Sequence, residues 1–461
     1  MDKVKHINHL YLRAAFGAHP SYVEKRKGKS IRYLVDELFE QSKEIKTLNT
    51  LKNPVEDKPA GNFRLLVMVL KSRKQIIEMG HDWITQTAHY PYPSLREKMT
   101  FFWHSHFATR IPLAYLMQVQ NNSIRKHALG NFRELLHTMA KDPAMIVFLN
   151  NQQNRKKHPN ENFARELMEL FTLGEGHYSE TDIKEAARAF TRWHINRYGS
   201  FEFNSNEHDY GEKTFKGASG RLSGENVIDV LLKDKQCALF ITQKIYSFFV
   251  NTKPDEKKIA KLADEFYQSN YDIAQLMKSI FTSDWFYHKE NVGTKIASPI
   301  ELILRYHTLL QINNTHTKSF TRILQVLGQE MFYPPNVAGW PSGRNWIDSS
   351  SMMLRMKLPF IFFEDYPQSF SNMEDDDAQF NNGKERKLNI DSKANWKNFA
   401  TSFKEIKDDK LIDEMANALL QIGYSSDDQI IIDLFKRGTS HEEKIKSIAI
   451  HLFALPEFQL V

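Results

Sequence analysis

The sequence predicts a mainly α-helical protein, built as a large multi-helix globular domain, and three observations support this. Apolar residues recur at helical spacing along most of the chain, for example at Ile31, Leu34, Val35, Leu38 and Phe39. The hydrophobic fraction of 41% and the charged fraction of 26% are those of an ordinary globular protein, so disorder of the whole chain is not expected. No internal repeat with a solenoid period is present.

Helix starts can be placed from capping patterns. Ser94 is a good N-cap, and Glu97 follows at the capping-box spacing, which predicts a helix that runs to about Phe107. Ser179 with Asp182 gives a second, weaker pattern of the same kind. Between them the sequence predicts a central helix over residues 162–173, preceded by a polar loop.

Two segments depart from the helical pattern. Over residues 198–224 Phe201 and Phe203 alternate with polar residues and glycines recur, which predicts a short β-hairpin or an ordered loop insertion. Residues 366–396 are polar and predict a linker or surface insertion. This divides the chain into a helical core domain over 1–365, which carries the polar site, and C-terminal helices over 397–461, which are expected to pack on the same core.

Composition excludes several classes of function. The net charge of +6, from 62 basic and 56 acidic residues, is too weak a bias to predict nucleic-acid binding, and the basic run 155–158 is expected to be solvated. Cys237 is the single cysteine, so neither an intramolecular disulfide nor a cysteine metal cluster is expected. No apolar run follows the N-terminus or reaches about 18 residues, so we expect no signal peptide, no membrane span and a cytoplasmic location.

The central helix is the most informative element. Asn162, Glu166 and Glu169 share one face beside an apolar stripe, because they are spaced at i, i+4 and i+7. Two carboxylates one turn apart can bind a cation, or one can hold a proton for the other. The alternative is a solvated helix face on which Glu161 pairs with Arg165.

Histidines could complete such a site. His106 ends the helix that begins at Ser94, whereas His208 lies in the glycine-rich segment. Together with Glu166 and Glu169 they match the nitrogen and oxygen ligands of zinc, iron or manganese. We therefore predict these four as catalytic residues and as ligands of a divalent metal ion. The alternative for each histidine is a hydrogen-bonded core or turn residue.

Four further residues are predicted to bind substrate. Asn162 and Arg165 would position substrate or the carboxylates, and Asp209 follows His208 directly. Trp340 lies in the loop 334–341, which is rich in proline and glycine. That loop would form either an apolar platform at the rim of a pocket or a plug in the core.

Several motifs in order resemble the bacterial domain-of-unknown-function family 1800. They include the segments 9–17, 97–107, 160–170, 185–193 and 334–341, together with His208-Asp209 and the chain end 455–459. The resemblance implies a helical fold and no established activity. One departure is Arg192, where the family usually has glycine before the tryptophan. His104 and His177 fall at positions that vary in the family, which lowers both as catalytic candidates.

The resemblance also implies a partner and a second location. Family members are often encoded beside proteins of another uncharacterised family, number 1501, which looks sulfatase-like and is usually exported. A chain without its own signal could then reach the periplasm by co-export with that partner.

Two functions from different classes follow. The first is a metal-dependent hydrolase or oxidoreductase, in which the ion activates water or oxygen. The second is a non-catalytic assembly partner, in which the polar residues form a buried network.

Overall fold

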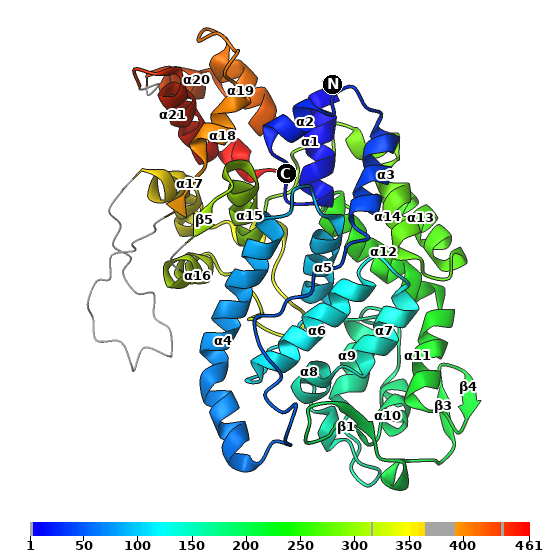
Figure 1. Ribbon diagram of the computed structural model, residues 1–461. Coiled ribbons are helices and arrows are strands. Elements are labelled where there is room, and N and C mark those ends of the chain that lie inside the picture. The colour runs from blue at the N-terminus through cyan, green and yellow to red at the C-terminus, as the bar shows by residue number, and fades with distance from the viewer. Residues whose placement is uncertain (1–2, 315–316, 365–391, 435–437) are drawn as a thin grey trace.

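The computed structural model describes residues 3–314, 317–364, 392–434 and 438–461, and within them the protein is mainly helical (Figure 1). The helices in chain order are α1 (Lys3–Ala14), α2 (Pro20–Glu24), α3 (Ile31–Gln41), α4 (Asn62–Ala88), α5 (Leu95–His106), α6 (Ala114–His127), α7 (Phe132–Ala140), α8 (Pro143–Phe148), α9 (Asn162–Glu169), α10 (Glu180–Ala189), α11 (Gly224–Lys233), α12 (Lys235–Phe249), α13 (Glu256–Gln268), α14 (Ile273–Phe281), α15 (Pro299–Leu310), α16 (Thr317–Val326), α17 (Ser349–Phe363), α18 (Trp396–Thr401), α19 (Leu411–Leu419), α20 (Ser426–Leu434) and α21 (His441–Ala454). The predicted fold class is confirmed.

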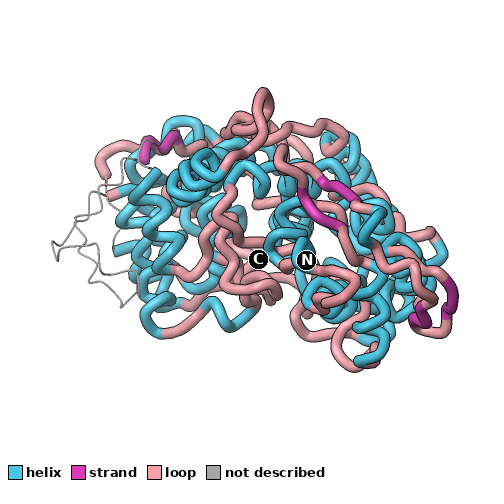
Figure 2. The backbone as a smooth tube through the Cα atoms, turned by 90° about the horizontal axis from the view of Figure 1, so that it is seen from below, coloured by secondary structure: helices cyan, strands magenta, loops and turns pink. Residues whose placement is uncertain are grey.

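The strands are short and pair only in twos, as Figure 2 shows. They are β1 (Trp193–Ile195), β2 (Phe201–Phe203), β3 (Lys213–Phe215), β4 (Ala218–Gly220), β5 (Asn313–Asn314) and β6 (Ser392–Lys393). β1 pairs antiparallel with β2, β3 with β4, and β5 with β6. The hairpin predicted within residues 198–224 is therefore confirmed as β3–β4, and β2 belongs to a second pair with β1. None of the described helices is long and apolar enough to cross a membrane.

The predicted capping residues begin their helices. The Ser94 hydroxyl accepts a hydrogen bond from the backbone N–H of Glu97 at 3.3 Å. Ser179 and Asp182 form both halves of a capping box at the start of α10. The central helix, however, is shorter than predicted, because α9 ends at Glu169 rather than Leu173. Beyond it the chain makes wider turns, in which the N–H of Leu173 reaches the carbonyl of Met168 at 2.8 Å.

Two clusters of buried apolar side chains form the core. The first surrounds α12 and takes in α3, α7, α10 and α14, while the second surrounds α15 and takes in α17, α18, α19 and α21. α1 and α5 contribute side chains to both clusters. Leu10 and Trp103 belong to the first cluster, and Leu12 and Phe101 belong to the second. These two helices therefore join the two parts of the core.

A group of buried charges lies where the two clusters meet. The Glu301 carboxylate accepts hydrogen bonds from Lys98 at 2.6 Å and from Lys295 at 2.8 Å, and all three side chains are buried. We call Lys98, Lys295 and Glu301 the charge cluster. Burial alone would raise the pKa of Glu301, but the two ammonium groups hold it well below its usual range. Burial also lowers the pKa of Lys295 to about 7.

Residues 459–461 pair with the backbone beside the charge cluster. Val461 donates its N–H to the carbonyl of Lys295 at 2.8 Å, and Ala297 donates to the carbonyl of Gln459 at 2.9 Å. The C-terminal helices α18 to α21 thus share the second core cluster with α15 and α17. Most of the predicted linker 366–396 lies outside the described residues, so the predicted division of the chain stays a prediction.

Candidate functional site

The face of α9 that carries Glu166 and Glu169 is only partly buried. Burial raises the pKa of Glu166, and the neighbouring charge of Glu169 raises it further. Glu169 itself accepts a hydrogen bond from the Tyr178 hydroxyl. Asn162 is exposed. Arg165 pairs with Glu180 at 2.9 Å and with Glu161 at 3.4 Å, so the alternative pairing predicted from the sequence forms.

His106 caps the end of α9 instead of facing those carboxylates. Its Nε2 lies 3.3 Å from the carbonyl oxygen of Phe171, and Lys244 donates to the carbonyl of Leu170 at 2.9 Å. The Lys244 Nζ also lies 3.5 Å from His106 Nδ1. Donors at this position satisfy carbonyls that the end of a helix leaves unpaired. Burial, and then the charge of Lys244, lower the pKa of His106, so the ring is neutral at pH 7.

His208 and Asp209 fasten the glycine-rich segment to the end of α10. Nδ1 of His208 lies 2.9 Å from both the hydroxyl and the carbonyl oxygen of Thr191. Asp209 accepts a hydrogen bond from Arg188 at 2.8 Å, and Lys213 donates to the Asp209 carbonyl. Each of these groups is thus occupied by a local partner.

The structure does not assemble the metal site predicted from the sequence. Glu166 and Glu169 lie close enough to interact, but His106 and His208 are each engaged elsewhere. Within the described ranges no group of three or more histidine, cysteine, aspartate or glutamate side chains is arranged to hold a metal ion. The spacing of Glu166 and Glu169 fixes only their helix face, whereas the histidines are placed by tertiary contacts, so a functional role for these four residues stays a prediction.

Trp340 is a core plug and not a platform. Its side chain is 8% exposed and its ring lies 5.5 Å from that of His104, which also meets Phe332. The neighbouring Gly339 has φ +86°, and a Cβ there would come within 2.3 Å of the Ser105 carbonyl oxygen. The loop therefore lies tightly against the end of α5. Of the two roles predicted for this loop, the structure supports the plug.

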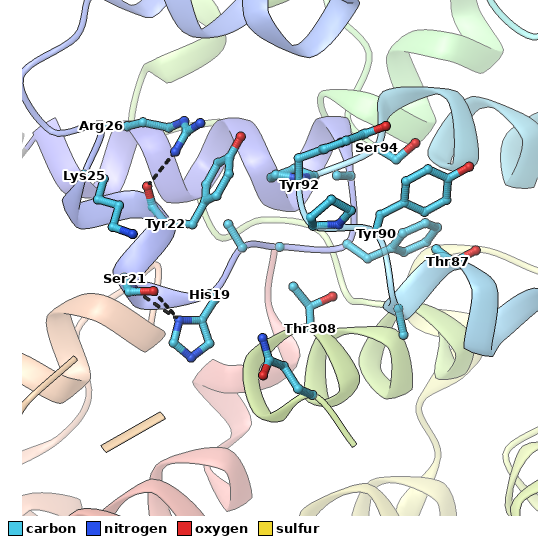
Figure 3. A pocket seen from close by; sticks show the side chains of 18 of the residues that line it. His19, Ser21, Tyr22, Lys25, Arg26, Thr87, Tyr90, Tyr92, Ser94 and Thr308 are labelled. Atoms are coloured by element: carbon cyan, nitrogen blue, oxygen red, sulfur yellow. Dashed lines mark hydrogen bonds between the residues drawn. The ribbon is translucent and has the colours of Figure 1, made fainter. Parts of the chain in front are cut away.

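A pocket of about 300 Å³ opens elsewhere, between α2 and the segment that precedes α5 (Figure 3). We call it the tyrosine pocket, because Tyr22 faces Tyr90 and Tyr92 across it. Further lining residues come from the end of α15 and from α18, namely Thr308, Gln311 and Asn398. No aspartate or glutamate is among the residues that line it, whereas Lys25 and Arg26 are.

The polar groups of the tyrosine pocket differ in their hydrogen bonding: the Tyr22 hydroxyl bonds to Gln41 and the Tyr92 hydroxyl donates to Glu44, whereas others have no partner in the described chain. The backbone N–H of Ser21 donates to Nδ1 of His19, so Nδ1 carries no proton and the ring proton sits on Nε2. Burial lowers the pKa of His19 to about 4, which keeps the ring neutral at pH 7. Within the described part of the chain, His19 Nε2 and the Tyr90 hydroxyl are buried without a hydrogen-bond partner. Buried donors of this kind are normally satisfied.

The two cations of the tyrosine pocket differ in their partners. Arg26 lies over the Tyr22 ring and makes a bidentate ion pair with Glu37, at 2.6 and 2.9 Å. Lys25 is exposed and forms no ion pair with the residues the structure describes. A second hollow of about 490 Å³ continues on the other side of Tyr90 and adds Lys393, again without a carboxylate in its lining. Lys25 and Lys393 are therefore the cations of this site that form no ion pair with a described residue, whereas Glu37 and Glu44 bond to Arg26 and Tyr92 beside it.

Little in the sequence predicts this pocket. Its residues come from positions 15–26, 87–94, 308–311 and 398, which no local pattern connects. The alternation Tyr90-Pro91-Tyr92-Pro93 was the one available signal, because prolines hold the neighbouring rings in fixed positions.

Comparison with known proteins places the chain in a family. A family described as a protein of unknown function, DUF1800, matches residues 9–460. The chain belongs to the DUF1800 family. No curated protein and no solved structure matches it. The match covers nearly the whole of this DUF1800 member, including both core clusters and the tyrosine pocket, and it assigns no activity to any of them.

The unusual Arg192 of this DUF1800 member lies where the backbone favours glycine. Its φ is +66°, in the left-handed region, and its guanidinium pairs with Glu207 at 2.6 Å. A side chain in this region costs roughly 1–2 kcal/mol, and a β-branched one is the least tolerated. The structure thus gives a physical reason why glycine suits this position.

We expect Arg192→Val to be about 1–2 kcal/mol less stable than Arg192→Gly, because glycine adopts positive φ without strain. The glycine variant should be about as stable as the parent protein, since it loses a partly buried ion pair but also loses the strain. Urea unfolding followed by circular dichroism measures both. Equal stability of the valine and glycine variants would contradict the strain.

Proposed function

We propose that the protein binds a small anionic molecule that carries a ring, and that it does so in the tyrosine pocket. The observation that carries this proposal is the chemistry of the lining: cations, hydroxyls, amides and aromatic rings, with no carboxylate. The ligands that such a lining favours carry a carboxylate, phosphate or sulfate on a sugar or aromatic ring. We do not propose the metal-dependent enzyme expected from the sequence, because the described residues do not bring its predicted ligands together.

Each group has a part in this binding. Lys25 supplies a charge that no carboxylate neutralises, and it would approach the anionic group from the open side. The partly exposed Thr308 hydroxyl in the lining is a neutral donor that a ligand oxygen could accept. Tyr22, Tyr90 and Tyr92 offer ring faces against which a sugar or aromatic ring packs.

The test is isothermal titration of the full chain with glucuronate, glucose 6-phosphate and 4-hydroxybenzoate, with glucose as the uncharged control. We expect one of the three anions to bind and glucose to bind at least about tenfold more weakly. Lys25→Glu should weaken binding of that anion by about tenfold or more, because a repulsive charge replaces an attractive one. Lys29→Glu makes the same charge change at an exposed position outside the lining and should leave binding unchanged.

Two results would contradict the proposal. One is the absence of heat with all three anions. The other is equal weakening by Lys25→Glu and Lys29→Glu, which would mean that only the overall charge of the protein matters. Circular dichroism of both variants establishes that they are folded.

An assembly role is the second candidate, and the hydrogen bonding of the predicted site favours it. His106, His208 and Asp209 all bond to partners that hold neighbouring elements together, as a structural network would require. The partner would be a protein of the family 1501 suggested by the resemblance. Co-expression followed by size-exclusion chromatography tests it, and separate elution of the two proteins would count against this role.

A further inference from the structure

The N-terminal half of α4 carries an apolar stripe that nothing in the described chain covers. The C-terminal half of this helix buries Ile76 and Trp83 in the second core cluster. Towards the other end, Phe63, Leu66 and Leu70 are 81%, 54% and 73% exposed. Because they are spaced at i, i+3 and i+7, they lie along one side of the helix. We call these three residues the α4 stripe.

The α4 stripe lies at the free end of a projecting helix. In Figure 1 the first turns of α4 reach the lower end of the molecule, well away from α15 and α16, which accompany its upper part. A chain of 27 residues in one helix spans about 40 Å, so its far end can extend beyond the body. Large exposed apolar side chains gathered in this way mark an interaction surface.

Basic side chains outnumber acidic ones around the α4 stripe, where the acidic neighbours are Glu56 and Asp57 before Lys58 and Glu78 after the stripe. Residues 58–77 contain five basic side chains and no acidic one, namely Lys58, Arg64, Lys71, Arg73 and Lys74. All five are exposed. Arg73 pairs with Glu330, and Lys74 lies 3.6 Å from Glu78. Lys58, Arg64 and Lys71 form no ion pair with the residues the structure describes, so they remain available to an external anionic surface.

An apolar hollow of about 650 Å³ continues the surface on the body of the protein. Leu65 and Met68 of α4 line it from one side, and Ile195 and Tyr198 line it from the β1–β2 pair. A hydrogen bond of 2.9 Å from the N–H of Ala60 to the carbonyl of Arg197 holds the two sides together. Arg197, Tyr198 and Glu202 are all exposed in this lining, so this side adds one cation, one anion and an aromatic ring to the same surface.

We infer that this end of the molecule docks on the surface of an anionic lipid bilayer. The α4 stripe enters the boundary between headgroups and acyl chains, and Lys58, Arg64 and Lys71 meet the lipid phosphates. A helix with large apolar residues on one side and basic residues beside them has the chemistry of an interfacial helix. Each basic residue near an anionic leaflet adds to the attraction. This inference is independent of ligand binding in the tyrosine pocket.

Sedimentation with vesicles tests the docking. The full chain should sediment with vesicles of phosphatidylcholine and phosphatidylglycerol in equal parts, much less with phosphatidylcholine alone, and less as salt is raised. The double variant Phe63→Ser/Leu70→Ser should bind about tenfold more weakly or worse, because two large apolar side chains no longer leave water. The control Met353→Ser/Ile430→Ser removes two exposed apolar residues outside the α4 stripe and should bind like the parent.

Three outcomes would overturn the inference. The first is no sedimentation with the anionic vesicles. The second is equal binding by the two double variants. The third is a parent protein that elutes as a dimer without lipid while the α4 stripe variant elutes as a monomer, which would assign the surface to a second copy of the chain. Circular dichroism of both variants excludes unfolding as the cause of lost binding.

Discussion

Glu301→Ala is expected to lower the free energy of unfolding by about 3–5 kcal/mol, the typical cost of removing one partner from a buried ion pair. Glu301 is the single carboxylate of the charge cluster and accepts from both Lys98 and Lys295. Without it, two ammonium groups would be left buried with no counter-charge. The loss would also separate the two core clusters at the point where they meet, since Glu301 lies on α15 and Lys98 on α5.

Chemical unfolding in urea at pH 7 measures this loss. Glu24→Ala is the matched control, because Glu24 pairs with Lys27 on the surface and both side chains are largely exposed. Its removal should change the free energy of unfolding by less than about 1 kcal/mol. A Glu301→Ala protein as stable as the Glu24→Ala protein would show that the charge cluster does not stabilise the fold.

His104→Phe is expected to change how stability depends on pH. His104 is buried among the rings of Trp83, Phe332 and Trp340, and neither ring nitrogen has a partner in the described chain. Burial, and then the charge of Arg125, lower its pKa to about 3. The unfolded chain, in which a histidine titrates near 6.5, therefore binds a proton over a range in which the native protein does not.

The direction of the pH dependence follows from this difference in pKa between the native and the unfolded protein. As the pH falls from 6.5 towards 3, protons favour the unfolded state, so His104 makes the parent protein progressively less stable. Phenylalanine cannot take up a proton and removes this penalty. Relative to their difference at pH 7, the variant should gain about 2 kcal/mol over the parent by pH 5. Denaturant unfolding at both pH values measures it, and a difference that does not change with pH would contradict a buried, neutral His104.

The helical fold could be predicted because its signals are local. Apolar periodicity and the caps at Ser94 and Ser179 depend on neighbouring residues, and each produced the expected element. The end of α9 could not be predicted in the same way. Lys244 bonds to the carbonyl of Leu170 just beyond this end, 74 positions earlier in the chain, and no local pattern predicts such a contact.

The predicted site shows the same limit. Spacing correctly put Glu166 and Glu169 on one face. Spacing could not say that His106 would turn to a helix end, or that His208 would bond to Thr191. The tyrosine pocket was missed for the complementary reason. Its lining residues are individually ordinary, and only the packing of distant segments brings them together.

The pairing of residues 459–461 with 295–297 bears on the order in which the protein is made. These contacts join segments more than 160 positions apart, and they complete the second core cluster around α15. A growing chain on the ribosome can assemble the first cluster from residues that have already emerged. The second cluster, however, cannot close until residues 459–461 have been synthesised, because they pair with residues 295–297. We therefore expect a stage in which the first cluster has formed and the second is still open.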